Sequence, residues 1–217
     1  MGCKECGLEL GLGVCRDPLC NFSLKWKISQ YTTQLSAAAE TFEIGVKAVV
    51  RILADLLPTG RTIFLTGIGK SGLIARKSVA TWQSLGLPAQ NISVQDMCHG
   101  DLGILRPGDV IVYVSNSGAT DELMSIAQYV SKTFEVKQLA VTANRSSPLS
   151  GIVDVHVPIC DFKIQEADIC NLAPTVSAVL FMVFLDVLGM KLAEFTEFSA
   201  ETFRKYHPGG ALVRNSS

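Results

Sequence analysis

A chain of 217 residues, 48% of them hydrophobic and 18% charged, is long enough to form one domain with a large core. Its formal net charge is -1, so the chain does not have the excess positive charge that nucleic-acid-binding proteins usually carry. We therefore expect no nucleic-acid partner. No stretch reaches the ~18 uninterrupted apolar residues of a membrane span. The best candidate, residues 176–190, contains Asp186 and is expected to be a buried helix instead.

The amino-terminal residues are not expected to act as a secretory signal, because Glu5 and Glu9 interrupt the apolar run that such a signal needs. The seven cysteines, an odd number, are therefore expected to be free thiols in a reducing, cytoplasmic compartment. Four of them lie in residues 1–27 with CxxC spacing at the start, at Cys3, Cys6, Cys15 and Cys20. This cluster is open to two interpretations, a structural zinc site or a poorly ordered extension, and no metal is assigned to it.

The remainder, residues 28–217, is expected to be a single domain without an internal repeat or linker. Residues 28–57 have helical apolar spacing, and Pro58 with Gly60 ends the run. Strands are predicted from residue 62 and at 89–94, 109–115, 136–142 and 154–159, with helices at 76–85, at 120–132, near 174 and near 200. Strands that alternate with helices predict an α/β fold with a mostly parallel five-stranded sheet, covered on both faces. Ligands of such sheets bind beyond the carboxyl ends of the strands.

The first predicted strand ends in a glycine-rich turn, GIGKSG at residues 67–72. A strand, a tight turn and a helix start place backbone N–H groups and a positive helix end around an anion, and Lys70 adds a charge. A Walker A loop is excluded because position 64 is Phe where glycine is needed. The turn does fit GxGxxG, so a dinucleotide site with Asp96 as its acidic partner stays an alternative.

A second polar turn follows the strand at 109–115 and crowds hydroxyl groups at a helix start. Such a turn can donate hydrogen bonds to several oxygens of one phosphate. The alternative interpretation is that these hydroxyl groups only cap the following helix. Together the two turns suit a monophosphate and its attached polyol better than a pyrophosphate. The predicted substrate-binding residues are Gly69, Ser71, Ser115, Asn116, Ser117, Gly118 and Thr120.

Five motifs in order give the chain a specific resemblance: GIGKSG, HGDLG at 99–103, SNSGATDE at 115–122, NLAPT at 171–175 and HPGGAL at 207–212. From about Ala39 to Arg214 the chain resembles the sugar isomerase (SIS) domain of arabinose-5-phosphate isomerases. The resemblance implies a three-layer α/β/α sandwich (SIS fold), a homotetramer, and no organic cofactor or metal. It also implies a cytoplasmic isomerase of D-ribulose 5-phosphate and D-arabinose 5-phosphate, which in bacteria serves Kdo and lipopolysaccharide biosynthesis.

Residue by residue, the family's active-site lysine matches Lys70, its glutamates match Glu122 and Glu166, and its histidines match His99 and His207. Its phosphate loop matches Ser115, Ser117 and Thr120. Many members carry carboxyl-terminal CBS modules, and because this chain stops soon after HPGG, regulation through them is expected to be absent. The segment IQEADIC before NLAPT departs from the KEA run of similar proteins.

The chemistry can also be weighed from the residues. Moving a carbonyl between C1 and C2 needs a base that carries one proton across an enediol and a second group that serves the oxygens. A carboxylate suits this once its pKa is raised in a dry cleft. Glu166 is the hypothesised base, with a solvated loop acid as the alternative, and Glu122 is either the second acid/base or a favourable helix-start charge. Because HPGG follows a helix, His207 is expected to reach a neighbouring subunit's site, while His156 on a strand is interpreted as structural.

Three other functions compete. The first is a phosphosugar sensor without catalytic activity, which would need only the phosphate loop. The second is a dinucleotide oxidoreductase. The third is an isomerase of another sugar phosphate, such as 3-hexulose 6-phosphate, because sugar length is set by pocket depth.

Overall fold

The computed structural model describes residues 24–209, so the four amino-terminal cysteines lie outside the described residues. Its centre is an all-parallel sheet of five strands in the order β2-β1-β3-β4-β5. The expected α/β fold and each of the five predicted strands are confirmed. The strands are β1 (Ile63–Thr66), β2 (Ala89–Asn91), β3 (Val110–Ser115), β4 (Lys137–Thr142) and β5 (Val155–Pro158).

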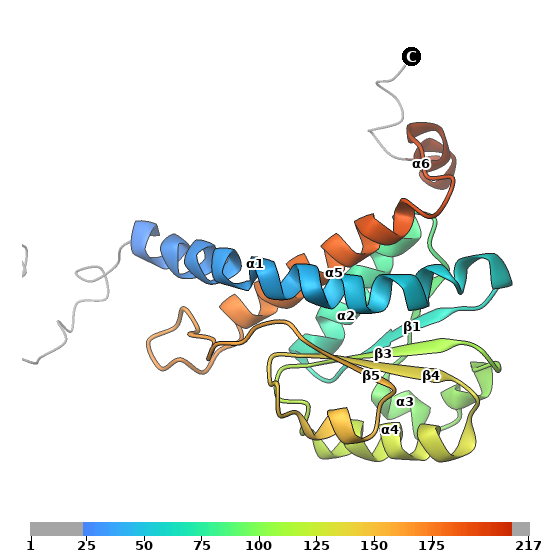
Figure 1. The fold of residues 1–217 in the computed structure, drawn as a ribbon, viewed down its shortest axis with the longest axis horizontal. Coiled ribbons are helices and arrows are strands. Elements are labelled where there is room, and N and C mark those ends of the chain that lie inside the picture. The colour runs from blue at the N-terminus through green and yellow to red at the C-terminus, as the bar shows by residue number, and fades with distance from the viewer. Residues whose placement is uncertain (1–23, 210–217) are drawn as a thin grey trace, which may run out of the picture.

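Helices cover both faces of the sheet, which gives three layers (Figure 1). One face carries α1 (Leu24–Ala54), α2 (Lys70–Ser84) and α5 (Val176–Ala193), and the other carries α3 (Val94–Met97) and α4 (Asp121–Thr133). A last helix, α6 (Ala200–Tyr206), follows α5, and 3₁₀ turns occupy Leu57–Thr59, Asp101–Ile104 and Pro148–Gly151. The predicted helix at 28–57 is one continuous helix that begins four residues earlier, and its first turns extend beyond the sheet in Figure 1.

The glycine-rich turn between β1 and α2 is built by close backbone contact. A Cβ at Gly67 would lie 2.7 Å from the Val114 carbonyl oxygen, and a Cβ at Gly72 would lie 2.7 Å from the Gly67 oxygen. Gly69 has φ 59°, a conformation that favours glycine, and α2 begins at the next residue. The helix therefore starts at Lys70, six residues before the predicted position, and its amino terminus faces the end of β1.

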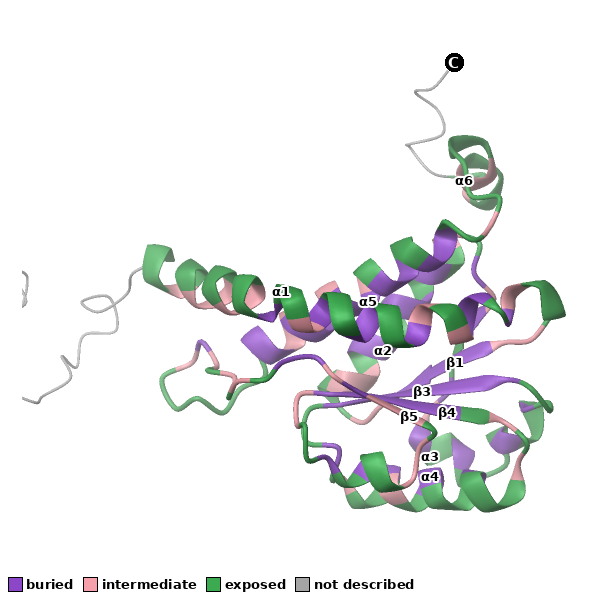
Figure 2. Cartoon of the chain, in the orientation of Figure 1, coloured by how far each residue is buried: buried purple, intermediate pink, exposed green. Residues whose placement is uncertain are grey.

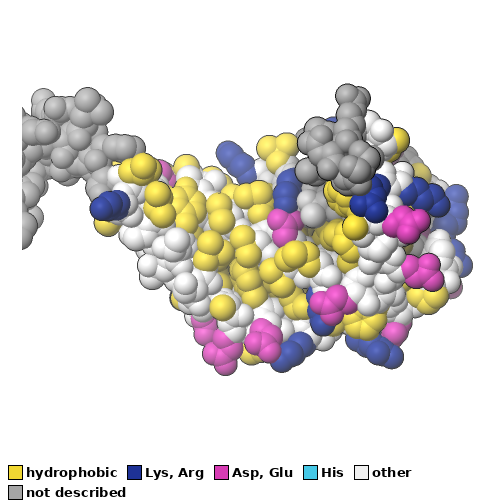
Figure 3. Space-filling view, turned by 90° about the horizontal axis from the view of Figure 1, so that it is seen from above, with side chains coloured by type: hydrophobic (Ala, Val, Ile, Leu, Met, Phe, Trp, Pro, Cys, Tyr) yellow, Lys and Arg dark blue, Asp and Glu magenta, His cyan; other side chains and the backbone are white. Residues whose placement is uncertain are grey.

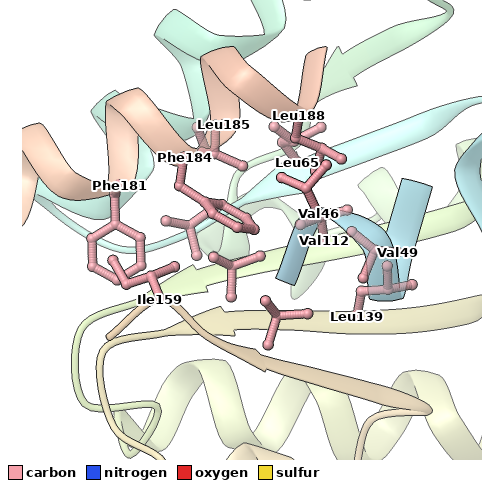
Figure 4. Packing of buried hydrophobic residues seen from close by; sticks show 14 of the residues in the cluster. Val46, Val49, Leu65, Val112, Leu139, Ile159, Phe181, Phe184, Leu185 and Leu188 are labelled. Atoms are coloured by element: carbon pink, nitrogen blue, oxygen red, sulfur yellow. The ribbon is translucent and has the colours of Figure 1, made fainter. Parts of the chain in front are cut away.

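The core has two parts because successive strand residues point to opposite faces of the sheet. Figure 2 shows buried residues along the strands and on the helices of both outer layers. In β1, Ile63 and Leu65 join the cluster under α1, α2 and α5, whereas Phe64 joins the cluster under α3 and α4. Figure 4 shows the first cluster, in which Phe181 and Phe184 of α5 meet strand residues and α1. Burying aromatic and aliphatic side chains in this way is the main source of the fold's stability.

Helix α5 packs tightly on α2 at Gly189, where an added Cβ would lie 2.4 Å from the indole nitrogen of Trp82. That nitrogen donates a 2.9 Å hydrogen bond to the Leu185 carbonyl oxygen. Among residues 24–209, α5 is the one helix long and apolar enough to cross a membrane, and 56% of it is buried inside the fold. Asp186 of α5 pairs with Lys77 of α2 at 2.6 Å. Because its apolar residues belong to the core cluster, α5 is a core element, as the sequence predicts.

Candidate functional site

Loops that follow β1, β3 and β4 meet at the carboxyl edge of the sheet and enclose three adjoining pockets. All three pockets are lined by Asn116, which follows β3 directly. Their volumes are about 180, 280 and 610 Å³. Six predicted substrate residues line these pockets, at the place where open parallel sheets bind ligands: Gly69, Ser71, Ser115, Asn116, Ser117 and Thr120. The seventh, Gly118, is buried and lines none of the three.

The smallest pocket is a polar cup. It is lined by Ile68, Ser71, Val114, Ser115, Asn116, Ser117, Thr120 and Leu123. The amide of Gly118 donates to the Ser115 hydroxyl at 3.0 Å, and the amide of Ala119 donates to the Ser117 hydroxyl at 3.2 Å. Thr120 is the amino-terminal cap residue of α4, but its side chain makes no capping hydrogen bond. Hydroxyl groups, amides and a helix start around one small space suit an anion such as phosphate.

The middle pocket places a positive charge beside the cup. Lys70 is the first residue of α2, its side chain is exposed, and it lines this pocket with Ser71, Asn116 and Pro174. The helix dipole adds to the positive potential at that end of α2. An anion in the cup is therefore flanked by two helix starts and one ammonium group.

The largest of these three pockets is a polar cleft between the β3 and β4 loops and the segment 160–174. It contains four residues that sequence reasoning missed: Asn144, Arg145, Asp161 and Lys163. The first two follow the predicted strand at 136–142, so the rule about carboxyl ends of strands could have found them. The other two lie in an irregular segment, and no sequence signal marked them.

Glu166 also lines this cleft, and it is bound to the start of α5. Its Oε2 accepts hydrogen bonds from the Thr175 amide at 2.8 Å, the Thr175 hydroxyl at 2.9 Å and the Ser177 amide at 3.2 Å. Partial burial opposes ionisation of this carboxyl, but the hydrogen bonds from Ser177 and Thr175 outweigh it, so the pKa of Glu166 is lowered. The raised pKa that the chemical argument asks of a carboxylate base is not found at Glu166.

The other predicted catalytic residues are not assembled around the cup within this chain. Glu122 lies in the first turn of α4 and His99 follows α3, and both are exposed and line none of the three pockets. His207 follows α6 and lies at the far end of α2, where its Nε2 is 3.2 Å from the Ser84 hydroxyl. The 15 residues of α2 separate it from Lys70 by about 20 Å.

These features define a class, namely three-layer α/β proteins with a polar, anion-suited site at the carboxyl edge of a parallel sheet. The chain belongs to the SIS domain family, whose match covers residues 56–191, more than half of the chain. The matched region runs from the end of α1 to α5, so it contains the whole sheet and the three pockets.

Curated relatives are consistent with this assignment. The chain is 37% identical over 170 residues to arabinose 5-phosphate isomerase KdsD of Pseudomonas aeruginosa, covering 78% of this chain and 50% of the relative. It is 31% identical over 198 residues to arabinose 5-phosphate isomerase KpsF of Escherichia coli, covering 91% and 59%. The chain thus spans about half the length of the curated relatives it matches.

A solved structure of an Escherichia coli CFT073 protein in complex with arabinose 5-phosphate resembles this chain with a TM-score of 0.66 and 29% identity. The match covers 86% of this chain and all of that one.

We predict that Glu166→Gln destabilises the fold in a pH-dependent way. Because the folded-state pKa is below its ordinary value, the carboxylate stabilises the fold above that ordinary value, and this contribution is lost as pH falls through the lowered pKa. Denaturant unfolding at neutral pH should show a loss of about 1–2 kcal/mol from the weakened hydrogen bonds to α5. The difference from wild type should shrink in acid.

The matched control is Glu40→Gln on the exposed surface of α1, which should change the unfolding free energy little at either pH. An equal, pH-independent loss in both variants would contradict the role of Glu166 as the anchor of α5.

Proposed function

We propose that this chain is an isomerase that interconverts D-ribulose 5-phosphate and D-arabinose 5-phosphate through an enediol. The observation that carries the proposal is the polar cup beside Lys70, which shares Asn116 and Ser117 with the cleft that is lined by Glu166. The names of the curated relatives and the related protein solved with arabinose 5-phosphate support the substrate class. Kdo and lipopolysaccharide synthesis in the cytoplasm is the corresponding biological setting.

In this proposal the phosphate occupies the cup, where the hydroxyls of Ser71, Ser115, Ser117 and Thr120 and the start of α4 bind its oxygens. Lys70 neutralises the phosphate or polarises a sugar oxygen. The polyol then extends past Asn116 into the larger cleft. Asn144 and Arg145 line that cleft with Asn116 and provide hydrogen-bonding groups for sugar hydroxyls.

Proton transfer is assigned to Glu166, because it lines the cleft while Glu122 does not. The carboxylate takes the proton from C2 of the aldose, which leaves the enediol, and returns it to C1 to form the ketose. A second acid/base group moves a proton between O2 and O1, and Glu122, His99 and His207 are the candidates. The lowered pKa keeps Glu166 ionised in the free enzyme, as a proton acceptor must be.

His207 is assigned to the site of a neighbouring copy, because about 20 Å of α2 separates it from Lys70 of its own chain. Hydrophobic side chains gather on the face that carries α1 and α5 (Figure 3), and the exposed ones include Ile44, Val187 and Met190. Such a face suits association with further copies of the chain. A homotetramer is the proposed assembly.

Proton NMR of the purified protein with D-ribulose 5-phosphate in D2O is the direct test of the reaction. We predict that the anomeric signal of D-arabinose 5-phosphate appears with deuterium at C2, because an enediol base exchanges its proton with solvent. Product without label would argue for a shielded base or a hydride shift. Saturable binding of the sugar phosphate without turnover would replace the proposal with a sensor.

Steady-state kinetics distinguish the two carboxylates. Glu166→Gln should lower kcat by about 10²- to 10⁴-fold, the usual contribution of a positioned base, and change KM little. In the wild type, kcat/KM should fall in acid only below the ordinary range of a glutamate, as pH passes through the lowered pKa of Glu166. A larger kcat loss in Glu122→Gln than in Glu166→Gln would transfer the role of base to Glu122.

Co-expression of two inactive variants tests whether sites are shared between copies. Lys70→Met and His207→Ala should each abolish most activity alone, and mixed assemblies should recover activity because some sites then combine an intact Lys70 with an intact His207. Assemblies of a single variant are the control. Mixed assemblies as inactive as those controls would show that each copy builds its site alone.

A further inference from the structure

We propose that His156 is a positioning residue for the phosphate site, acting through Thr142 and Asn144 on the loop that follows β3. The inference rests on the proposed function, because it takes that loop to be the phosphate-binding part of the site. His156 lies on β5 and lines none of the three pockets, and its role is therefore indirect.

The four residues form a continuous chain of hydrogen bonds. The His156 Nε2 lies 2.8 Å from the Thr142 hydroxyl, at the end of β4. That hydroxyl is 2.9 Å from the Asn144 carbonyl oxygen and 3.3 Å from the Asn144 amide. The side-chain amide of Asn144 then donates to the Ser117 carbonyl oxygen at 3.3 Å. Ser117 lines the polar cup, so the chain links an edge strand to the candidate anion site.

Proton accounting fixes the direction of these bonds. The Thr142 hydroxyl has one hydrogen, which it donates to the Asn144 carbonyl oxygen. The hydroxyl oxygen must then accept from the Asn144 amide and from His156, so Nε2 of His156 carries a hydrogen. Thr142 is fully buried, and an unpaired group there would be costly. Burial also lowers the pKa of His156, which favours the neutral ring.

The network belongs to a wider contact between the β4 and β3 loops. Besides Ser117, the carbonyl oxygens of Asn116 and Gly118 accept from the β4 loop, at 3.1 Å from the Ala143 amide and 3.2 Å from the Leu149 amide. In a planar trans peptide the N–H points opposite to the C=O. The amides of Gly118 and Ala119 are accordingly turned toward the hydroxyls of Ser115 and Ser117, which line the cup.

The hydrogen bonds to these carbonyl oxygens therefore keep the cup in its binding conformation before a ligand enters. Loss of His156 should make that conformation less rigid. This effect is on binding rather than on the chemical step, because none of the proton-transfer groups belongs to the network. A merely structural histidine would lower stability without changing affinity for phosphate.

The test compares His156→Leu, which removes the donor, with His156→Gln, whose amide nitrogen can replace Nε2. The readouts are the dissociation constant for inorganic phosphate, KM and kcat with D-arabinose 5-phosphate, and Tm. The control is Val157→Ala, which weakens the same strand on the opposite face of the sheet. We expect His156→Leu to raise the phosphate dissociation constant and KM about five- to tenfold, in line with one lost hydrogen bond, with kcat little changed. His156→Gln should stay near wild type, and Val157→Ala should lower Tm alone.

A lower Tm with unchanged phosphate affinity in His156→Leu would overturn the proposal, as would an equal loss of affinity in His156→Gln. If His156→Leu does not fold, Thr142→Val removes the same link at nearly constant volume, and it should raise the phosphate dissociation constant likewise. Wild-type turnover tests the proposed function separately. The change in phosphate affinity tests the network whether or not the sugar is isomerised.

Discussion

The site depends on the parallel register that brings the ends of β1, β3 and β4 to one edge of the sheet. Ser115 at the end of β3 pairs with Thr142 at the end of β4, so the loops that follow these strands leave the sheet level with each other. The shorter β1 ends beside Tyr113, two residues earlier along β3. Its glycine turn therefore has room to fold against the Val114 carbonyl and to direct α2 at the same edge. A shift of the strand pairing by one residue would turn every side chain of that strand to the opposite face of the sheet and would misalign the loops at this edge.

On that edge, polar groups of one loop orient those of the next. The β4 loop binds carbonyl oxygens of the β3 loop, and Glu166 binds amides at the start of α5. The Glu166 segment is also held from α1, because Gln34 exchanges two hydrogen bonds with the backbone of Gln165 at 2.7 and 2.8 Å. The irregular chain between β5 and α5 is thus fixed at both sides. A cleft bounded by such loops keeps its shape without regular secondary structure.

Periodicity predicted the sheet well because buried parallel strands read as short apolar runs, as in DVIVYVS at 109–115. It placed the start of α2 too late, since the polar residues of GKSG hide a helix that begins directly at a glycine turn. The polar cup and the position of Lys70 beside it could be predicted, because both lie where a strand ends and a helix begins. The lowered pKa of Glu166 could not be predicted from the sequence, because its hydrogen-bond partners Thr175 and Ser177 come close to it only when the loop is folded. The distance between His207 and Lys70 depends on where α6 lies in the fold, and the spacing of residues in the sequence does not indicate that position.

The two outer strands of the sheet are short, β2 with three residues and β5 with four. Proline stands at the border of each, Pro88 just before β2 and Pro158 as the last residue of β5, and proline has no backbone N–H to offer. Short edges with few free donors are poor templates for pairing with a strand of another molecule. Continuous growth of the sheet from chain to chain is therefore disfavoured, and the proposed contacts between copies fall to the helical layers. Association through those layers would leave the strands that carry the site undisturbed.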